Sequence, residues 1–231
     1  MFKLMKLEMK KFKLGSYSVN AVIANFVILG FIFLIAYISK VEGDQDFVNY
    51  QEVLTVIDSF VRGTFIIFAA TLIAKLIIGE FKNKTITTLF MYPISRKKII
   101  TAKLAIVFIF TFTWIIISNL FITSVYCLVS VNYQLIPDTL TASLLQEHGV
   151  SVLMYAVAAS GMSLIPLYFG MKKYSIPTTI ITSILIVVLV TSNNGGFSLN
   201  DIFVIPLSLA LIGLVIAYLA IRNIDKIDIK V

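Results

Sequence analysis

The chain contains six apolar segments, each about long enough to cross a lipid bilayer as a helix. The hydrocarbon core of a bilayer is about 30 Å thick, and a helix needs roughly 20 residues to span it. Only 13% of the residues are charged, far below the roughly 25% of a soluble domain. We therefore predict an all-α polytopic protein with one transmembrane domain over residues 1–231. The expected spans are residues 19–39, 61–79, about 104–129, 150–170, 175–192 and 202–221.

Basic residues are concentrated in alternate connections between these segments. Sixteen Lys and Arg lie in residues 1–18, 80–103, 171–174 and the tail after 221. The connections 40–60, 130–149 and 193–201 hold eight acidic residues and, as their only basic residue, Lys40. Since cytoplasmic loops of membrane proteins are enriched in Lys and Arg, we predict that both termini are cytoplasmic. We therefore attribute the net charge of +7 to contact with the membrane surface, and we expect no nucleic-acid partner.

The N-terminal stretch MFKLMKLEMKKFKL, residues 1–14, has the pattern of a helix lying in the membrane interface. Phe2, Met5, Met9 and Phe12 form one stripe, and a stripe of lysines lies beside it. Such a helix rests its apolar face on the bilayer and directs its lysines to anionic headgroups. The apolar run that follows lacks a small-x-small cleavage site, which favours a retained span over a signal peptide.

The residues needed for common catalytic and cofactor sites are missing. No G-x-x-x-x-G-K-[ST] motif occurs, so we expect no nucleotide or other cofactor in this chain. His148 is the only histidine, and every acidic residue is expected in a loop or at the edge of a span. We therefore expect no metal site, no catalytic residue and no enzyme activity. Arg62 is expected to pair with Asp58, four residues earlier on a helix.

Residues 80–104, EFKNKTITTLFMYPISRKKIITAKL, form a basic segment between the second and third spans. We predict a short helix over residues 80–92 that Pro93 ends, because a proline ring disfavours helical backbone at the preceding residue. Ser95 is a suitable N-cap for the next helix. Apolar side chains of this loop, residues 80–98, would face lipid or a protein partner at the cytoplasmic surface.

This segment resembles the loop between the second and third spans of ABC-2 type permeases, which are the membrane subunits of ATP-binding-cassette exporters. The residues that carry the resemblance are Glu80, Thr85, Leu89, Pro93, Ser95, Arg96 and Lys103. The family has six spans, cytoplasmic termini, an N-terminal interfacial helix and a coupling helix in this loop. This chain departs from it at Lys84, where many members have glycine, and in the 193–201 connection, which is short for the outer helices of lipid exporters.

The resemblance implies that the loop docks in a cleft of a separate nucleotide-binding ATPase subunit, which would hold ATP and magnesium. A second permease subunit, identical or paralogous, would complete the transporter in a bacterial cytoplasmic membrane. The implied substrates are amphipathic peptides, such as toxins or antimicrobials, or hydrophobic compounds. A non-transport scaffold protein and an ion-coupled transporter remain as alternatives. The implied coupling residues are Glu80, Thr85, Ile86, Leu89, Phe90, Pro93, Ser95, Arg96 and Lys103.

Overall fold

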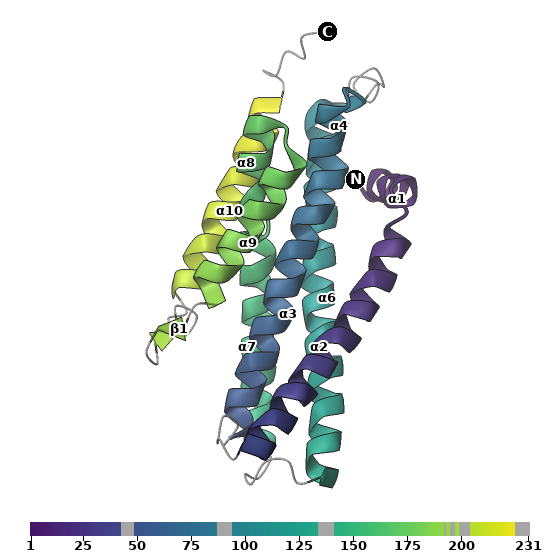
Figure 1. Ribbon diagram of the computed structural model, residues 1–231. Coiled ribbons are helices and arrows are strands. Elements are labelled where there is room, and N and C mark those ends of the chain that lie inside the picture. The colour runs from purple at the N-terminus through teal and green to yellow at the C-terminus, as the bar shows by residue number, and fades with distance from the viewer. Residues whose placement is uncertain are drawn as a thin grey trace.

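The computed structural model consists of long helices that run side by side, with one short helix lying across an end of the bundle (Figure 1). It describes residues 1–42, 49–86, 94–133, 141–191, 193–194, 197–198 and 204–224. The helices are α1 (Phe2–Lys11), α2 (Leu14–Glu42), α3 (Tyr50–Ile73), η1 (Ala74–Ile78), α4 (Gly79–Lys82), α6 (Arg96–Tyr133), α7 (Ala142–Met162), α8 (Pro166–Lys173), α9 (Ile176–Thr191) and α10 (Val204–Asn223). Two short strands, β1 (Asn193–Asn194) and β2 (Phe197–Ser198), pair antiparallel between α9 and α10.

Among the described residues, five helical stretches are long and apolar enough to cross a membrane. The stretches are Leu14–Ser39, Tyr50–Lys82, Arg96–Asn132, Ala142–Lys173 and Ile205–Arg222. The first four contain the first four predicted spans, and the last overlaps the sixth from residue 205 onward. The fifth predicted span corresponds to α9, which has 16 residues. A helix of that length covers only about 24 Å, so a sixth span stays a prediction.

Helix α3 occupies the middle of the bundle, beside α2, α6, α7 and α9 (Figure 1). It begins at Tyr50, well before the predicted span at 61, because Val53, Leu54 and Ile57 extend its buried stripe toward the N-terminus. Spacings of three and four residues keep such side chains on one helix face. The acidic and polar residues of 50–60 are therefore part of a packed helix that continues into the second span.

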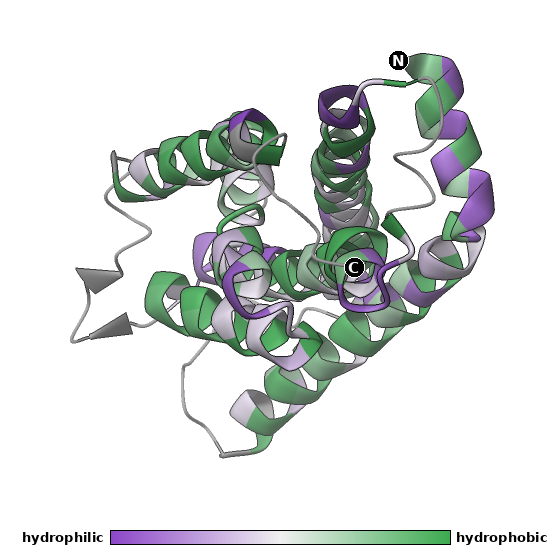
Figure 2. Ribbon diagram, turned by 90° about the horizontal axis from the view of Figure 1, so that it is seen from above, coloured by the Kyte–Doolittle hydropathy of each residue, from purple (hydrophilic) through white to green (hydrophobic). Residues whose placement is uncertain are grey.

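The outward faces of α2 and α10 are apolar. Phe26, Leu34 and Tyr37 on α2 are each more than half exposed, as are Leu211 and Tyr218 on α10. Viewed from above, hydrophobic residues cover much of the long helices, whereas hydrophilic residues are frequent on α1 (Figure 2). A membrane-spanning bundle is expected to be apolar on its outside as well as in its core, since its solvent is the lipid chain.

Helices α7 and α10 pack backbone against backbone. A Cβ atom at Gly161 would lie 2.8 Å from the Cβ of Ala210, and one at Gly213 would collide with the carbonyl oxygen of Gly161. Small residues allow this close approach, which is a common basis of helix association in membranes. The arrangement fixes α10 against the core while leaving its other face exposed.

Candidate functional site

A group of four charged side chains, three of them buried, joins α1, α4 and α6 at one end of the bundle. Lys103 of α6 is 0% exposed, and its Nζ lies 2.8 Å from Oε2 of Glu8 and 3.0 Å from Oε2 of Glu80. The other carboxylate oxygen of Glu80 accepts a hydrogen bond of 2.6 Å from Nζ of Lys11. We call Glu8, Lys11, Glu80 and Lys103 the charged cluster. Its two carboxylates and two ammonium groups balance in charge, which makes the burial of Glu8, Glu80 and Lys103 tolerable, whereas the Lys11 side chain is 47% exposed.

The aromatic ring of Phe12, at the corner between α1 and α2, lies against both lysines of the cluster. The Nζ atoms of Lys103 and Lys11 lie 4.8 and 5.0 Å from the ring centroid of Phe12, within the range of cation–π attraction. Lys13 adopts a φ of 50°, which turns the chain sharply between the two helices. Lys75 also reaches this corner, with its Nζ 4.8 Å from the ring centroid of Tyr17. The corner therefore holds α1 across the end of the bundle.

The structure brings three of the predicted coupling residues together. Glu80 and Lys103 form the ion pair described above, and Oγ1 of Thr85 donates a hydrogen bond of 3.4 Å to the carbonyl oxygen of Glu80. Ile86 lies beside them in sequence but is 0% exposed and belongs to a buried cluster with Ile100 and Leu104. In this chain Ile86 is thus a core residue, and its contact with a partner stays a prediction.

The remaining predicted residues lie at the start of α6 or outside the described residues. Helix α6 begins at Arg96, and the carbonyl of Ser95 accepts its first hydrogen bond, 2.9 Å from the backbone nitrogen of Lys98. This confirms Ser95 as the boundary residue. Ser95 is exposed and Arg96 is half-buried. Leu89, Phe90 and Pro93 lie outside the described residues.

The expected helix over residues 80–92 does not begin at Glu80. Residues 79–82 continue the long helix of α3 and η1, and a turn over 83–85 follows. Lys84 adopts a φ of 57° in this turn, a left-handed conformation that glycine accepts most easily. Lysine therefore occupies a backbone conformation that would suit glycine better. Glu80 consequently belongs to the end of the second predicted span.

Sequence reasoning missed two members of the charged cluster and one further buried acid. Glu8 is the only acidic residue in the lysine-rich stretch 1–18, and this isolation was a signal that it has a specific basic partner. Glu8 and Glu80 are 4% and 5% exposed, and Asp58, two turns into α3, is 7% exposed. Asp58 lies near the N-terminal end of the second membrane-length stretch, as expected, but its burial was not predicted. Its pairing with Arg62 uses a backbone atom, since Nε of Arg62 donates to the carbonyl oxygen of Asp58 at 3.1 Å.

Comparison with known proteins agrees with a transporter. Residues 4–189 match the sequence model of a family described as ABC-2 family transporter protein. The chain belongs to the ABC-2 transporter family. This ABC-2 protein is also 45% identical over 225 residues to YcbO, an uncharacterized protein of Bacillus subtilis (strain 168), a match that covers 97% of this chain and 99% of the relative. No solved structure matches it. Together with the apolar helices, the family indicates a multi-pass membrane protein of an ABC transporter.

Proposed function

We propose that this ABC-2 protein is the permease subunit of an exporter and that the charged cluster passes motion from an ATPase partner to the spans. The observation that carries the proposal is the complete burial of Lys103 between Glu8 and Glu80. Lys103 belongs to α6 and pairs with Glu8 of α1 and Glu80 of α4. This side chain therefore connects the start of the loop to both α1 and α6. An ATPase that moved the loop would shift these helices together, because a buried ion pair cannot separate without a large cost.

The distribution of exposed lysines supports a cytoplasmic position for this end. Lys82, Lys84, Lys97 and Lys98 are exposed around the turn and the start of α6. The start of α1 and the end of α10 lie at the same end of the bundle (Figure 1), so a cytoplasmic cluster implies that both termini are inside. We accordingly propose six spans, with α9 as the short fifth, and an interfacial α1 whose lysines meet lipid headgroups.

The proposed partners follow from the family and from the exposed surfaces. An ATPase subunit would contribute ATP, magnesium and hydrolysis, since this chain has no phosphate-binding loop. The exposed apolar faces of α2 and α10 offer surface to lipid and to a second permease subunit, identical or paralogous. The proposed substrates are amphipathic peptides, such as toxins or antimicrobials, or hydrophobic compounds, which would leave through a path between the two permease subunits.

The proposal is tested by affinity purification of the tagged chain from its native membrane in mild detergent. We expect a stoichiometric co-purifying protein with a Walker motif. A Leu89→Asp/Phe90→Asp variant should no longer co-purify with this ATPase, because docking in an apolar cleft of the ATPase would bury two carboxylates. Ile94→Asp is the matched control, since Ile94 is an exposed apolar residue of the same connection, 40% accessible.

The possible failures have different meanings. If the wild-type chain brings down no ATPase under conditions that keep other membrane complexes intact, the proposed function is wrong. If the Leu89→Asp/Phe90→Asp variant still recruits the ATPase and still supports export, only the assignment of the docking face is wrong.

A further inference from the structure

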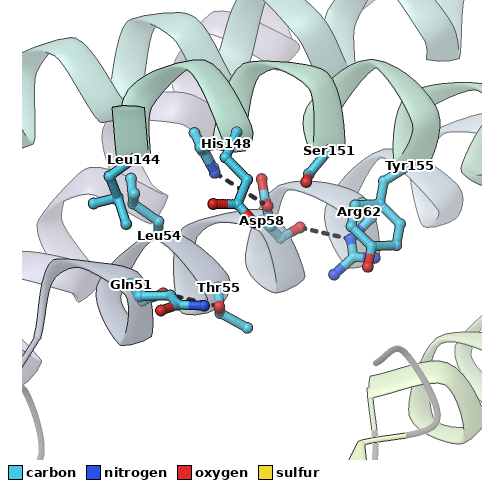
Figure 3. A pocket seen from close by; sticks show the side chains of 10 residues that line it. Gln51, Leu54, Thr55, Asp58, Arg62, Leu144, His148, Ser151 and Tyr155 are labelled. Atoms are coloured by element: carbon cyan, nitrogen blue, oxygen red, sulfur yellow. Dashed lines mark hydrogen bonds and ion pairs between the residues drawn. The ribbon is translucent and has the colours of Figure 1, made fainter. Parts of the chain in front are cut away.

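A polar pocket lies between α3 and α7 (Figure 3). Its lining comes from the first turns of these two helices, which begin at the end of the bundle opposite α4 and α1 (Figure 1). Its volume is about 180 Å³, which is room for a small organic group. Exposed residues of both helices surround the mouth, and buried residues of α3 form the floor. Its lining includes Leu54, Asp58 and Arg62 from α3, and Leu144, Glu147 and His148 from α7.

The floor of the pocket holds a carboxylate oxygen that lacks a donor. The Asp58 side chain is 9% exposed, and its Oδ2 lies 3.7 Å from Nδ1 of His148, which is too far for a hydrogen bond. Oδ1 of Asp58 and Nε2 of His148 are buried, and within the described part of the chain neither has a hydrogen-bond partner. Figure 3 shows Asp58 and His148 directed toward one another across the pocket. A buried acceptor without a donor is costly, so the pocket favours a ligand that donates.

Arg62 is held by other groups of the protein. Its Nε donates to the backbone carbonyl of Asp58 at 3.1 Å, and its guanidinium carbon lies 4.4 Å from the ring centroid of Tyr155. An aromatic face attracts a guanidinium group in this position. These contacts direct Arg62 along α3 and onto α7, and Oδ1 of Asp58 has no hydrogen-bond donor among the described residues.

The chemistry of the lining identifies the class of ligand. An anion would meet the carboxylates of Asp58 and Glu147, of which Glu147 is exposed at the mouth. The described residues contain no group of three or more His, Cys, Asp or Glu side chains that could hold a metal ion, which disfavours a metal as the ligand. Leu54 and Leu144 add an apolar wall suited to an alkyl stem. An ammonium group on a short alkyl chain satisfies all three features, because it donates, carries positive charge and has an apolar end.

We propose that this pocket binds a protonated primary amine, with the ammonium group donating to Oδ1 of Asp58. Binding as such does not depend on an ATPase. The proposal rests on the proposed function only for the origin of the amine, which would then belong to an exported cationic compound. The pocket lies toward the end that the proposed orientation makes external, so the amine would be held there late in export.

The test uses the purified full-length chain in mild detergent at pH 8, where an alkylamine is protonated and an unperturbed histidine is neutral. The probe is n-butylammonium chloride, with n-butanol as the uncharged control of similar shape, and binding is followed by saturation-transfer NMR. We expect saturable binding of n-butylammonium and at least tenfold weaker binding of n-butanol. Asp58→Asn should weaken n-butylammonium binding at least tenfold. Glu52→Gln, at an exposed position on the same helix, should change this affinity by less than twofold.

A second variant keeps the carboxylate and fills the space. Ser151→Leu adds an apolar side chain to the pocket lining and should also weaken amine binding at least tenfold, so the test does not depend on the folding of Asp58→Asn. Size-exclusion elution and circular dichroism identify the folded variants. The proposal is overturned if folded wild-type protein shows no saturable amine binding, if n-butanol binds equally well, or if every folded pocket variant binds like wild type. None of these results would bear on ATPase recruitment.

Discussion

Replacing Lys103 with methionine removes the ammonium group on which Glu8 and Glu80 converge. At 2.8 and 3.0 Å, each pair has a gross attraction of roughly 6 kcal/mol at an effective dielectric constant of about 20. Desolvation of the ions offsets much of this attraction. The carboxylate left behind stays buried, however, and breaking a buried pair on one side costs about 3–5 kcal/mol. We therefore expect Lys103→Met to lower the free energy of unfolding by about 3–5 kcal/mol.

The assay is equilibrium unfolding in detergent, followed by the fluorescence of Trp114, the only tryptophan of the chain. Trp114 on α6 stacks on Phe65 of α3, with ring centroids 6.3 Å apart, so it reports separation of these helices. Lys98→Met, an exposed position on the same helix, is the control and should change stability by less than about 0.5 kcal/mol.

A double variant separates the charge from the packing. In Lys103→Met the stranded group is Glu8, because Glu80 keeps its ion pair with Lys11. Adding Glu8→Gln removes the stranded charge and should recover more than half of the lost stability. A cost below about 1 kcal/mol for Lys103→Met, or a double variant less stable than Lys103→Met alone, would refute the view that the cluster is a buried, balanced ion-pair network.

Three further predictions concern the turn, the packing and the orientation. Lys84→Gly should stabilise the chain by about 1 kcal/mol in thermal unfolding, because φ is 57° at this position. The control Lys82→Gly, at the end of α4, should destabilise it by about 1 kcal/mol. A destabilising effect of Lys84→Gly would contradict the left-handed turn. Gly213→Ala should lower the free energy of unfolding by about 1–3 kcal/mol, because the added methyl group forces α10 away from Gly161. The control Gly30→Ala, which has open space around it, should not destabilise the protein. Equal effects of the two substitutions would argue against the close α7–α10 contact. In a Cys127→Ser background, an impermeant maleimide should label Glu52→Cys in intact cells and Lys98→Cys only after disruption, and the opposite pattern would invert the proposed orientation.

Much of the architecture was predictable because the apolar runs and their helical spacing are local properties of the sequence. The positions of α2, α6, α7 and α10 follow from hydropathy, and the start of α6 follows from Ser95. Boundaries that depend on tertiary packing were less accessible. The helix of α3 extends to Tyr50 because neighbouring helices cover Val53 and Ile57, and Tyr50 itself meets α6 through a hydroxyl contact of 3.1 Å with Ser130.

In the candidate site, too, some features were predictable from the sequence and others depend on tertiary packing. Glu80 and Lys103 were identified by resemblance, and the structure pairs them across 23 positions of sequence. Glu8 could not be added from spacing alone, because its contact with Lys103 joins residues 95 positions apart and requires α1 to fold across the bundle. Asp58 and His148 were likewise assigned to different outer segments. Only the packing of α3 against α7 brings them within 3.7 Å.

The π-helical turn η1 leads to the last prediction, because it lies between the two charged regions of one continuous helix. The backbone nitrogen of Gly79 donates to the carbonyl of Ala74, five residues earlier, which is the signature of one extra residue in an α-helix. Deleting Lys75, an exposed residue of this turn, should restore regular α-helix and keep Asp58 and Glu80 on their present faces. Deleting Ile67, in regular helix, should instead rotate Glu80 by about 100° away from Lys103. Unfolding measurements distinguish the two: Lys103→Met should still cost about 3–5 kcal/mol in the Lys75 deletion and almost nothing in the Ile67 deletion. If the penalty disappears in both backgrounds, the π-turn is not a one-residue insertion that leaves the helix faces in register.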